Sequence, residues 1–178
     1  MRKSALQVLA VLLVAATSAA AQLYDVQISA VPRKLDEQRD RQGGNVTVTT
    51  KEIAYKVTVE NRTFRAIPEL QMKYMIFYVD PQPHTREKPI EAYHTGTETL
   101  TDLQSNRAAT FETKPLKLTK EELDAGWYWV GSGSSRVKDK VTGVWIRAYS
   151  NGALVGEYSN PTTISKKREW KEPATFSE

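Results

Sequence analysis

The sequence has 178 residues and no cysteine, which excludes disulfides, thiol catalysis and cysteine-ligated metal centres. Its 25 basic residues outnumber 21 acidic ones, but Arg2 and Lys3 belong to an N-terminal segment that we expect to be removed. The rest of the chain, with 23 basic and 21 acidic residues, lacks the basic excess typical of nucleic-acid-binding domains. We therefore expect no nucleic-acid partner.

The first 21 residues have the three parts of a secretory signal peptide. A basic start, Met1-Arg2-Lys3, precedes an apolar run over residues 5–16 and small residues ending in Ala19-Ala20-Ala21. A transmembrane helix needs about 20 apolar residues, more than this run supplies, and no later stretch is apolar enough. We predict cleavage after Ala21, a periplasmic or secreted protein and no membrane span.

Alternation of apolar and polar residues predicts strands along one domain over residues 22–163. The first strand carries Val26, Ile28 and Ala30 and ends at Pro32. The clearest alternation covers residues 53–60, and residues 70–79 become apolar on both faces, which is typical of a central strand. Further strands are predicted over residues 91–98, 107–113, 142–149 and 153–159.

Other segments lack this period of two. Residues 33–45 are charged and contain Gly43-Gly44, which predicts a flexible surface loop. Thr119 and Glu122 form a capping-box signature before Gly126, which predicts one short helix within residues 118–126. Residues 127–130 are predicted to form a short strand, and residues 164–178 a charged, poorly ordered C-terminal tail.

Many short strands without alternating long helices predict a mostly β protein, an antiparallel β-sandwich with one short helix after the signal peptide. The run YKVTVENRTFRAIPELQMKYMIFYV and the later GVWIRAYSNGALVGEYSNP resemble the central strands and final hairpin of immunoglobulin-like or fibronectin type III-like domains. The chain also resembles small, uncharacterised, exported bacterial proteins with one such domain. The resemblance implies an immunoglobulin-like sandwich and no particular activity.

Few residues invite a catalytic or metal-binding interpretation. The two histidines, His84 and His94, could be combined with Asp80 and Glu91, but their spacing matches no metal signature. The serines stand in no nucleophile motif, and paired carboxylates such as Glu121-Glu122 suit a helix start. We therefore predict no catalytic residue, no metal site, no cofactor and no enzymatic activity.

The last predicted hairpin supplies the one candidate binding surface. With Asn151-Gly152 as a two-residue loop, three pairs fall on one face, namely Tyr149 with Leu154, Arg147 with Gly156 and Trp145 with Tyr158. The other face carries Val144, Ile146, Ala148 and Val155 and should be core. The candidate binding residues are therefore Trp145, Arg147, Tyr149 and Tyr158, here called the hairpin strip.

Exposed rings beside a cation suit stacking on a sugar or anchoring a protein. The alternative is that the hairpin strip covers the sheet, or lies beneath a loop or the segment around Trp127 and Trp129. The sequence thus predicts an exported, non-catalytic binding or structural module that works through protein contacts. A carbohydrate-binding module using the hairpin strip remains one alternative, and a hydrolase with an unrecognised site another.

Overall fold

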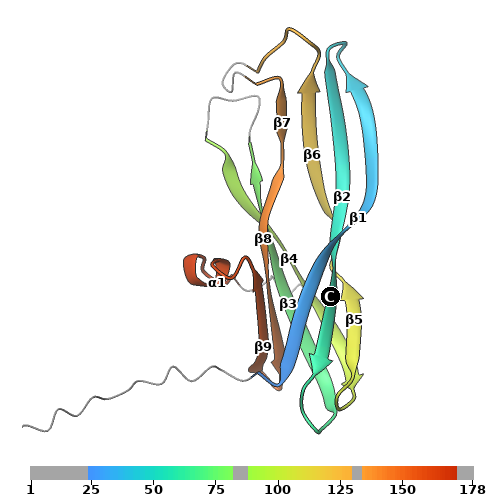
Figure 1. Cartoon of the computed structure of the whole chain (residues 1–178), viewed down its shortest axis with the longest axis vertical. Helices are drawn as coiled ribbons and strands as arrows, with labels where there is room; N and C mark the ends of the chain where they lie inside the picture. Colours follow the sequence, from blue (N-terminus) through green and yellow to red (C-terminus); the bar gives the residue numbers. More distant parts are fainter. Residues whose placement is uncertain (1–23, 82–87, 130–133, 172–178) are drawn as a thin grey trace, which may run out of the picture.

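Two antiparallel sheets make up most of the computed structural model, which describes residues 24–81, 88–129 and 134–171 (Figure 1). This confirms a mostly β protein with two antiparallel sheets and one short helix. The predicted signal peptide, His84 and the end of the tail lie outside the described residues. No helix in the described part of the chain is long and apolar enough to cross a membrane.

The first sheet has the order β1-β2-β6-β7, and β5 also pairs with β2. Strand β2 is long enough to pair with β6 along residues 46–53 and with β5 along residues 56–60. Residues 113–115 lie between β5 and β6, which therefore follow each other along the same side of β2. The strands of this sheet are β1 (Val26–Gln42), β2 (Val46–Asn61), β5 (Ala108–Glu112), β6 (Leu116–Leu123) and β7 (Arg136–Lys138).

The second sheet has the order β4-β3-β8-β9, so β3 and β8 are its central strands. The chain passes from the first sheet to the second between β2 and β3 and again at Asp139, between β7 and β8. A four-residue helix, α1 (Ile164–Lys167), follows the last strand. The strands of this sheet are β3 (Ile67–Asp80), β4 (Ile90–Leu103), β8 (Lys140–Ser150) and β9 (Ala153–Asn160).

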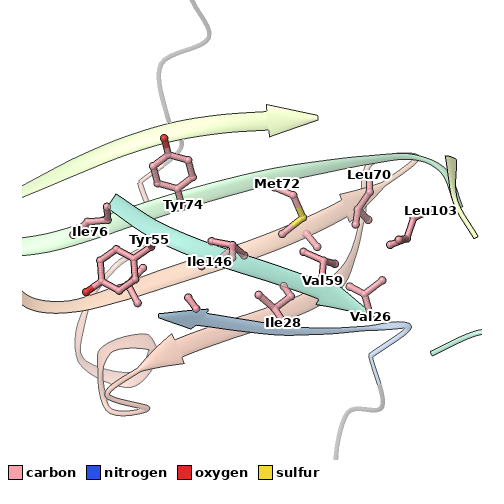
Figure 2. Close-up of a cluster of buried hydrophobic side chains, with 14 of the residues drawn as sticks. Val26, Ile28, Tyr55, Val59, Leu70, Met72, Tyr74, Ile76, Leu103 and Ile146 are labelled. Atoms are coloured by element: carbon pink, nitrogen blue, oxygen red, sulfur yellow. The ribbon is translucent and has the colours of Figure 1, made fainter. Parts of the chain in front are cut away.

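The core fills the space between the sheets with the residues that the alternation pattern placed inward (Figure 2). Val57 and Val59 of β2 are fully buried, whereas Lys56, which points to the other face of the strand, is exposed. The outer face of β3 is buried as well, through Met75 and Phe77. The prediction of a central strand covered on both sides is therefore confirmed.

The charged segment over residues 33–45 is a continuation of β1 and a turn, so the prediction of a loop was wrong. Strand β1 passes Pro32 and pairs with β2 as far as Gln42, with a bulge between Lys34 and Asp36. Proline is tolerated here because β1 is an edge strand. The segment is held by backbone pairing and buries little apolar surface, so hydrophobic periodicity could not reveal it.

The helix predicted within residues 118–126 is also wrong, because residues up to Leu123 form β6. The capping interaction does not form: the Thr119 N–H donates to the Asp139 carboxylate at 2.7 Å, and Glu122 pairs with Lys120 and Arg136. Pairing with β2 satisfies the backbone hydrogen bonds along the segment and outweighs the local helix signal. Residues 127–129 are not in a strand, and Val130 lies outside the described residues.

The predicted tail is ordered in its first half, as far as the structure describes it. Ile164 in α1 is buried against β8, and Trp170 packs on Trp145. Arg168 pairs with Glu91 of β4. Two apolar side chains within a charged sequence are enough to hold residues 164–171 on the outer face of the second sheet, so the expectation of poor order fails for this part.

Candidate functional site

The final hairpin has the predicted two-residue loop but not the whole predicted register. Ser150 pairs with Ala153 around Asn151-Gly152, and both loop residues have positive φ. Tyr149 pairs with Leu154 as predicted. A bulge at Ala148 and Tyr149 then shifts β9 by one residue, so that Arg147 faces Glu157 and Trp145 faces Ser159.

The shift moves Tyr158 out of the hairpin strip. Tyr158 now pairs with Ile146, packs against the core and donates a hydrogen bond to the Ala30 carbonyl at 3.4 Å. The predicted pairs of Arg147 with Gly156 and of Trp145 with Tyr158 are therefore wrong. The inward face is confirmed, since Val144, Ile146 and Ala148 are buried and Val155 packs beside them.

The remaining members of the hairpin strip share the outer face of β8, but the chain itself covers much of it. Trp145 is only 2% exposed, because Trp170 packs edge-on against it with ring centroids 5.1 Å apart. The Arg147 guanidinium lies 4.6 Å from the Trp145 ring centre and 4.5 Å from that of Trp170. Tyr149 keeps a partly open ring, with the Lys73 ammonium 5.1 Å from its centre.

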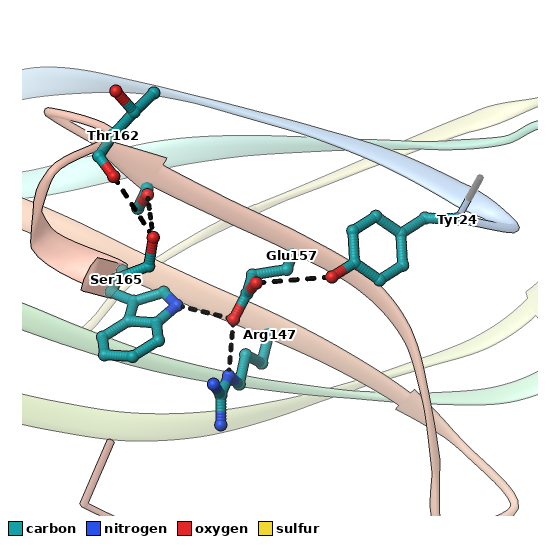
Figure 3. A network of polar contacts seen from close by, with 7 residues as sticks. Tyr24, Arg147, Glu157, Thr162 and Ser165 are labelled. Carbon is teal, nitrogen blue, oxygen red and sulfur yellow. Dashed lines mark hydrogen bonds and ion pairs between the residues drawn. The ribbon is translucent and has the colours of Figure 1, made fainter. Parts of the chain in front are cut away.

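Glu157 replaces Tyr158 in this cluster and binds its polar groups (Figure 3). Its carboxylate accepts hydrogen bonds from the Trp145 indole at 3.0 Å, from Arg147 Nε at 2.8 Å and from the Tyr24 hydroxyl at 3.3 Å. Burial and the adjacent Glu157 raise the pKa of Tyr24, which keeps its hydroxyl protonated as a donor. These polar groups bind one another, so the cluster covers the sheet, as the alternative interpretation of the hairpin strip expected.

A more open aromatic surface lies at the end of the molecule where the β1–β2 turn meets the β6–β7 loop, at the top of Figure 1. The Asp124 N–H donates to the Asn45 carbonyl at 2.9 Å, which ties the loop to the turn. Arg41 strengthens the junction through Asp124 at 2.6 Å and the Gly44 carbonyl at 3.1 Å. Two segments far apart in sequence are thereby fixed to each other.

Trp127 and Tyr128 project from this junction with 59% and 65% of their surfaces exposed. A four-residue turn sets their position, because the Trp127 N–H donates to the Asp124 carbonyl at 3.1 Å. Gly126 is the third residue of that turn and has a φ of 89°, which glycine adopts most readily. We call Arg41, Asp124, Trp127 and Tyr128 the tip surface.

Sequence reasoning missed the tip surface because it treated residues 127–130 as a strand. The usable signal was the run of three aromatic residues directly after Gly126, since a turn leaves such rings little sheet to cover. The other half of the surface depends on Arg41, in the segment that was expected to be a loop. Its approach to Asp124 follows from the length of β1 and β2, which local sequence does not indicate.

The histidine and carboxylate residues considered for metal binding are not brought together in the described part of the chain. His94 is half-buried on β4 opposite Ile76, and burial lowers its pKa. Glu91 pairs with Arg168. Within residues 24–81, 88–129 and 134–171 no group of three or more histidine, aspartate or glutamate side chains is placed to hold a metal ion.

No family model matches the chain, and no curated protein matches it either. Solved structures show weak likeness. The structural-genomics target SoR45 is 9% identical, with a TM-score of 0.33 over 76% of this chain and 85% of its own. A protein designated ApaA from Bordetella pertussis is 13% identical, with a TM-score of 0.36 over 76% and 92%. A protein from Akkermansia muciniphila is 17% identical, with a TM-score of 0.27 over 75% and 71%. Likeness at this level carries no inference about function.

Proposed function

We propose that this chain is an exported, non-catalytic β-sandwich module that binds another protein through its tip surface. The observation that carries the proposal is the exposure of Trp127 and Tyr128 on a turn held by backbone hydrogen bonds. Large flat rings bury much apolar area on binding and have few rotatable bonds to immobilise, and tryptophan, tyrosine and arginine dominate the binding energy of protein interfaces. Arg41 beside them adds a charged group for orientation.

We further propose that the sandwich is of the immunoglobulin-like or fibronectin type III-like kind. The order of its sheets supports this assignment. Immunoglobulin-like folds place the first, second and fifth strands in one sheet and the third, sixth and seventh in the other. Here β1, β2 and the broken strand β5/β6 share one sheet, while β3, β8 and β9 share the other. Strand β4 joins β3, as in sandwiches whose fourth strand changes sheets.

The tip surface is preferred to the hairpin strip because of ring accessibility. A sugar stacks on an open ring face, whereas Trp145 is covered by Trp170 and Tyr158 points into the core. A carbohydrate-binding role for that strip would require residues 164–171 to leave the sheet. The tip surface offers recognition by rings and charge without such a rearrangement, and the function requires no catalytic group.

Alanine at both Trp127 and Tyr128 should abolish partner binding with little effect on folding. Affinity capture of the mature protein from its native envelope or medium, followed by mass spectrometry, should recover a partner with the wild-type chain and lose it with the double variant. Each ring is expected to contribute about 2 kcal/mol to binding. The thermal midpoint should change by only about 2 °C, since surface substitutions alter stability by about 0.5 kcal/mol.

Phe64→Ala is the matched control, because Phe64 is 92% exposed in the turn between β2 and β3, at the opposite end of the sandwich. Its capture profile should match that of the wild-type chain. If the double variant captures the same partner as strongly as the wild type, the tip surface is not the binding site. If Phe64→Ala loses the partner instead, recognition occurs at the other end.

Export is the second part of the proposal and rests on the basic start, the apolar run over residues 5–16 and the small residues before Gln22. Mass spectrometry of the protein recovered from the periplasm or the medium should give a chain that starts at Gln22. Recovery of the intact chain from Met1 in the membrane fraction would contradict cleavage after Ala21.

A further inference from the structure

A cleft of about 640 Å³ lies between the two sheets, beside the core. Ile53, Tyr55 and Leu118 line it from β2 and β6, and Val141 and Pro161 line it from the start of β8 and the end of the last hairpin. Its volume falls in the range of about 300–1,000 Å³ that is typical of small-molecule sites. The tip surface does not include this cleft, so the inference below is independent of the proposed function.

The residue pattern of the first sheet explains why the cleft is open. On the inner face of β2, buried Tyr55 and Ile53 are followed by Lys51, which lies level with Leu118 of β6. One row further on, the inner position of β6 is Lys120. Burying charged ammonium groups against a second sheet is costly, which favours a gap between the sheets at these rows. The result is an apolar floor with cationic walls.

The two carboxylates that line the cleft, Glu37 and Asp139, only partly offset its four lysines. Glu37 is paired with Lys34 at 2.5 Å; that hydrogen bond is the main reason that its pKa is lowered, and the nearby charges of Lys51 and Lys120 contribute less. Asp139 accepts the backbone N–H of Thr119 at 2.7 Å. Burial raises the pKa of Asp139, with smaller contributions from Asp80 and Glu121, which do not line the cleft.

Four lysines line the cleft, and one of them, Lys120, is paired with Glu122 at 2.7 Å. Among the described residues, no carboxylate forms an ion pair with the other three, Lys51, Lys138 and Lys140. Lys51 belongs to one wall, Lys138 to β7 at the side and Lys140 to the opposite wall. These three lysines therefore line the cleft from three elements, and the cleft has four lysines against two carboxylates.

We propose that this cleft binds a small organic anion with an apolar body, of the class of medium-chain fatty acids. The chain would lie on Ile53, Tyr55, Leu118 and Val141, and the carboxylate would be met by Lys51, Lys138 and Lys140. Both parts are required: the floor removes apolar surface from water, and the lysines supply charge-assisted hydrogen bonds. A cation of the same length is repelled, and a short anion has too little apolar surface to bind.

Calorimetric titration with dodecanoate, below its micelle concentration, tests the proposal on the mature protein. Saturable binding with one ligand per chain is expected. Dodecyltrimethylammonium and acetate should each bind at least about tenfold more weakly, equivalent to about 1.4 kcal/mol. Equal binding of dodecanoate and its cationic counterpart, or the absence of saturable binding, would overturn the proposal. Binding only to anionic phospholipid vesicles, with no uptake of free dodecanoate, would also overturn it.

Two triple variants test whether dodecanoate binds in the cleft. The triple variant Lys51→Gln, Lys138→Gln, Lys140→Gln should weaken dodecanoate binding by about tenfold or more. Lys56→Gln, Lys117→Gln, Lys166→Gln removes the same charge from exposed lysines that do not line the cleft and should bind like the wild type. Circular dichroism melting verifies that both variants fold. Equal losses in the two variants would show general charge attraction and would contradict a built site.

Discussion

Gly96→Ala should destabilise the protein by about 3 kcal/mol, which lowers the thermal midpoint by about 6–12 °C. Gly96 pairs with Tyr74 across β4 and β3, and the tyrosine ring lies directly over it. A Cβ at this position would come within 2.1 Å of the Tyr74 hydroxyl oxygen and 2.3 Å of Cζ. One of the two strands or the ring must therefore move.

Tyr74 has little freedom to relieve that contact. Its side chain is fully buried in the core, and its hydroxyl accepts the Lys114 N–H at 2.8 Å. Burial raises the pKa of Tyr74, so the hydroxyl stays neutral in this site. Moving the ring would open a cavity and leave the backbone of the segment between β5 and β6 without its hydrogen-bond partner.

The origin of this effect is testable in a second background. Thermal or denaturant unfolding should show that Gly96→Ala costs far less when Tyr74 is already alanine, because the space above Gly96 is then empty. Thr99→Ala, at an exposed position of the same strand, should change stability by about 0.5 kcal/mol or less. If Gly96→Ala costs the same in both backgrounds, the contact with Tyr74 is not its cause.

The parts of the fold that sequence could predict are those in which strands lie on the core. In β2, Ile53, Tyr55, Val57 and Val59 are buried, and burial on one face is what creates alternation in a sequence. On the N-terminal side of Ile53, residues 46–52 of the same strand are held by pairing with β1 and β6. Backbone hydrogen bonds have no side-chain signature, and this is why the end of β1 and residues 118–123 of β6 were misassigned.

The hairpin strip could not be fully predicted from the sequence for a related reason. Trp145, Arg147 and Tyr149 do share one face of β8, as a period of two requires. The position of Tyr158, however, depends on a single bulge at Ala148 and Tyr149, which inverts the faces of β9 beyond it. The cover over Trp145 comes from Trp170, in a segment whose charged composition indicated a solvated tail.

Glu157→Ala should destabilise the protein by about 2–3 kcal/mol. The carboxylate neutralises Arg147 and accepts the Trp145 indole N–H and the Tyr24 hydroxyl. Without it, the guanidinium remains between two indole rings with no counter-charge, and the Trp145 donor is buried without an acceptor. The effect stays below that of a fully buried ion pair, because the side chains of Arg147 and Glu157 are each 23% exposed.

Denaturant unfolding of four variants separates this network from ordinary surface charge. Glu112→Ala removes an exposed carboxylate that pairs with Arg33 and should cost less than about 1 kcal/mol. Glu157→Gln keeps an acceptor but loses the charge, so it should destabilise the protein less than Glu157→Ala does. Combining Glu157→Leu with Arg147→Leu should recover part of the loss, because the unmatched cation is then gone. If Glu157→Ala costs no more than Glu112→Ala, Glu157 does not hold Tyr24 and the indole cluster to the sheet.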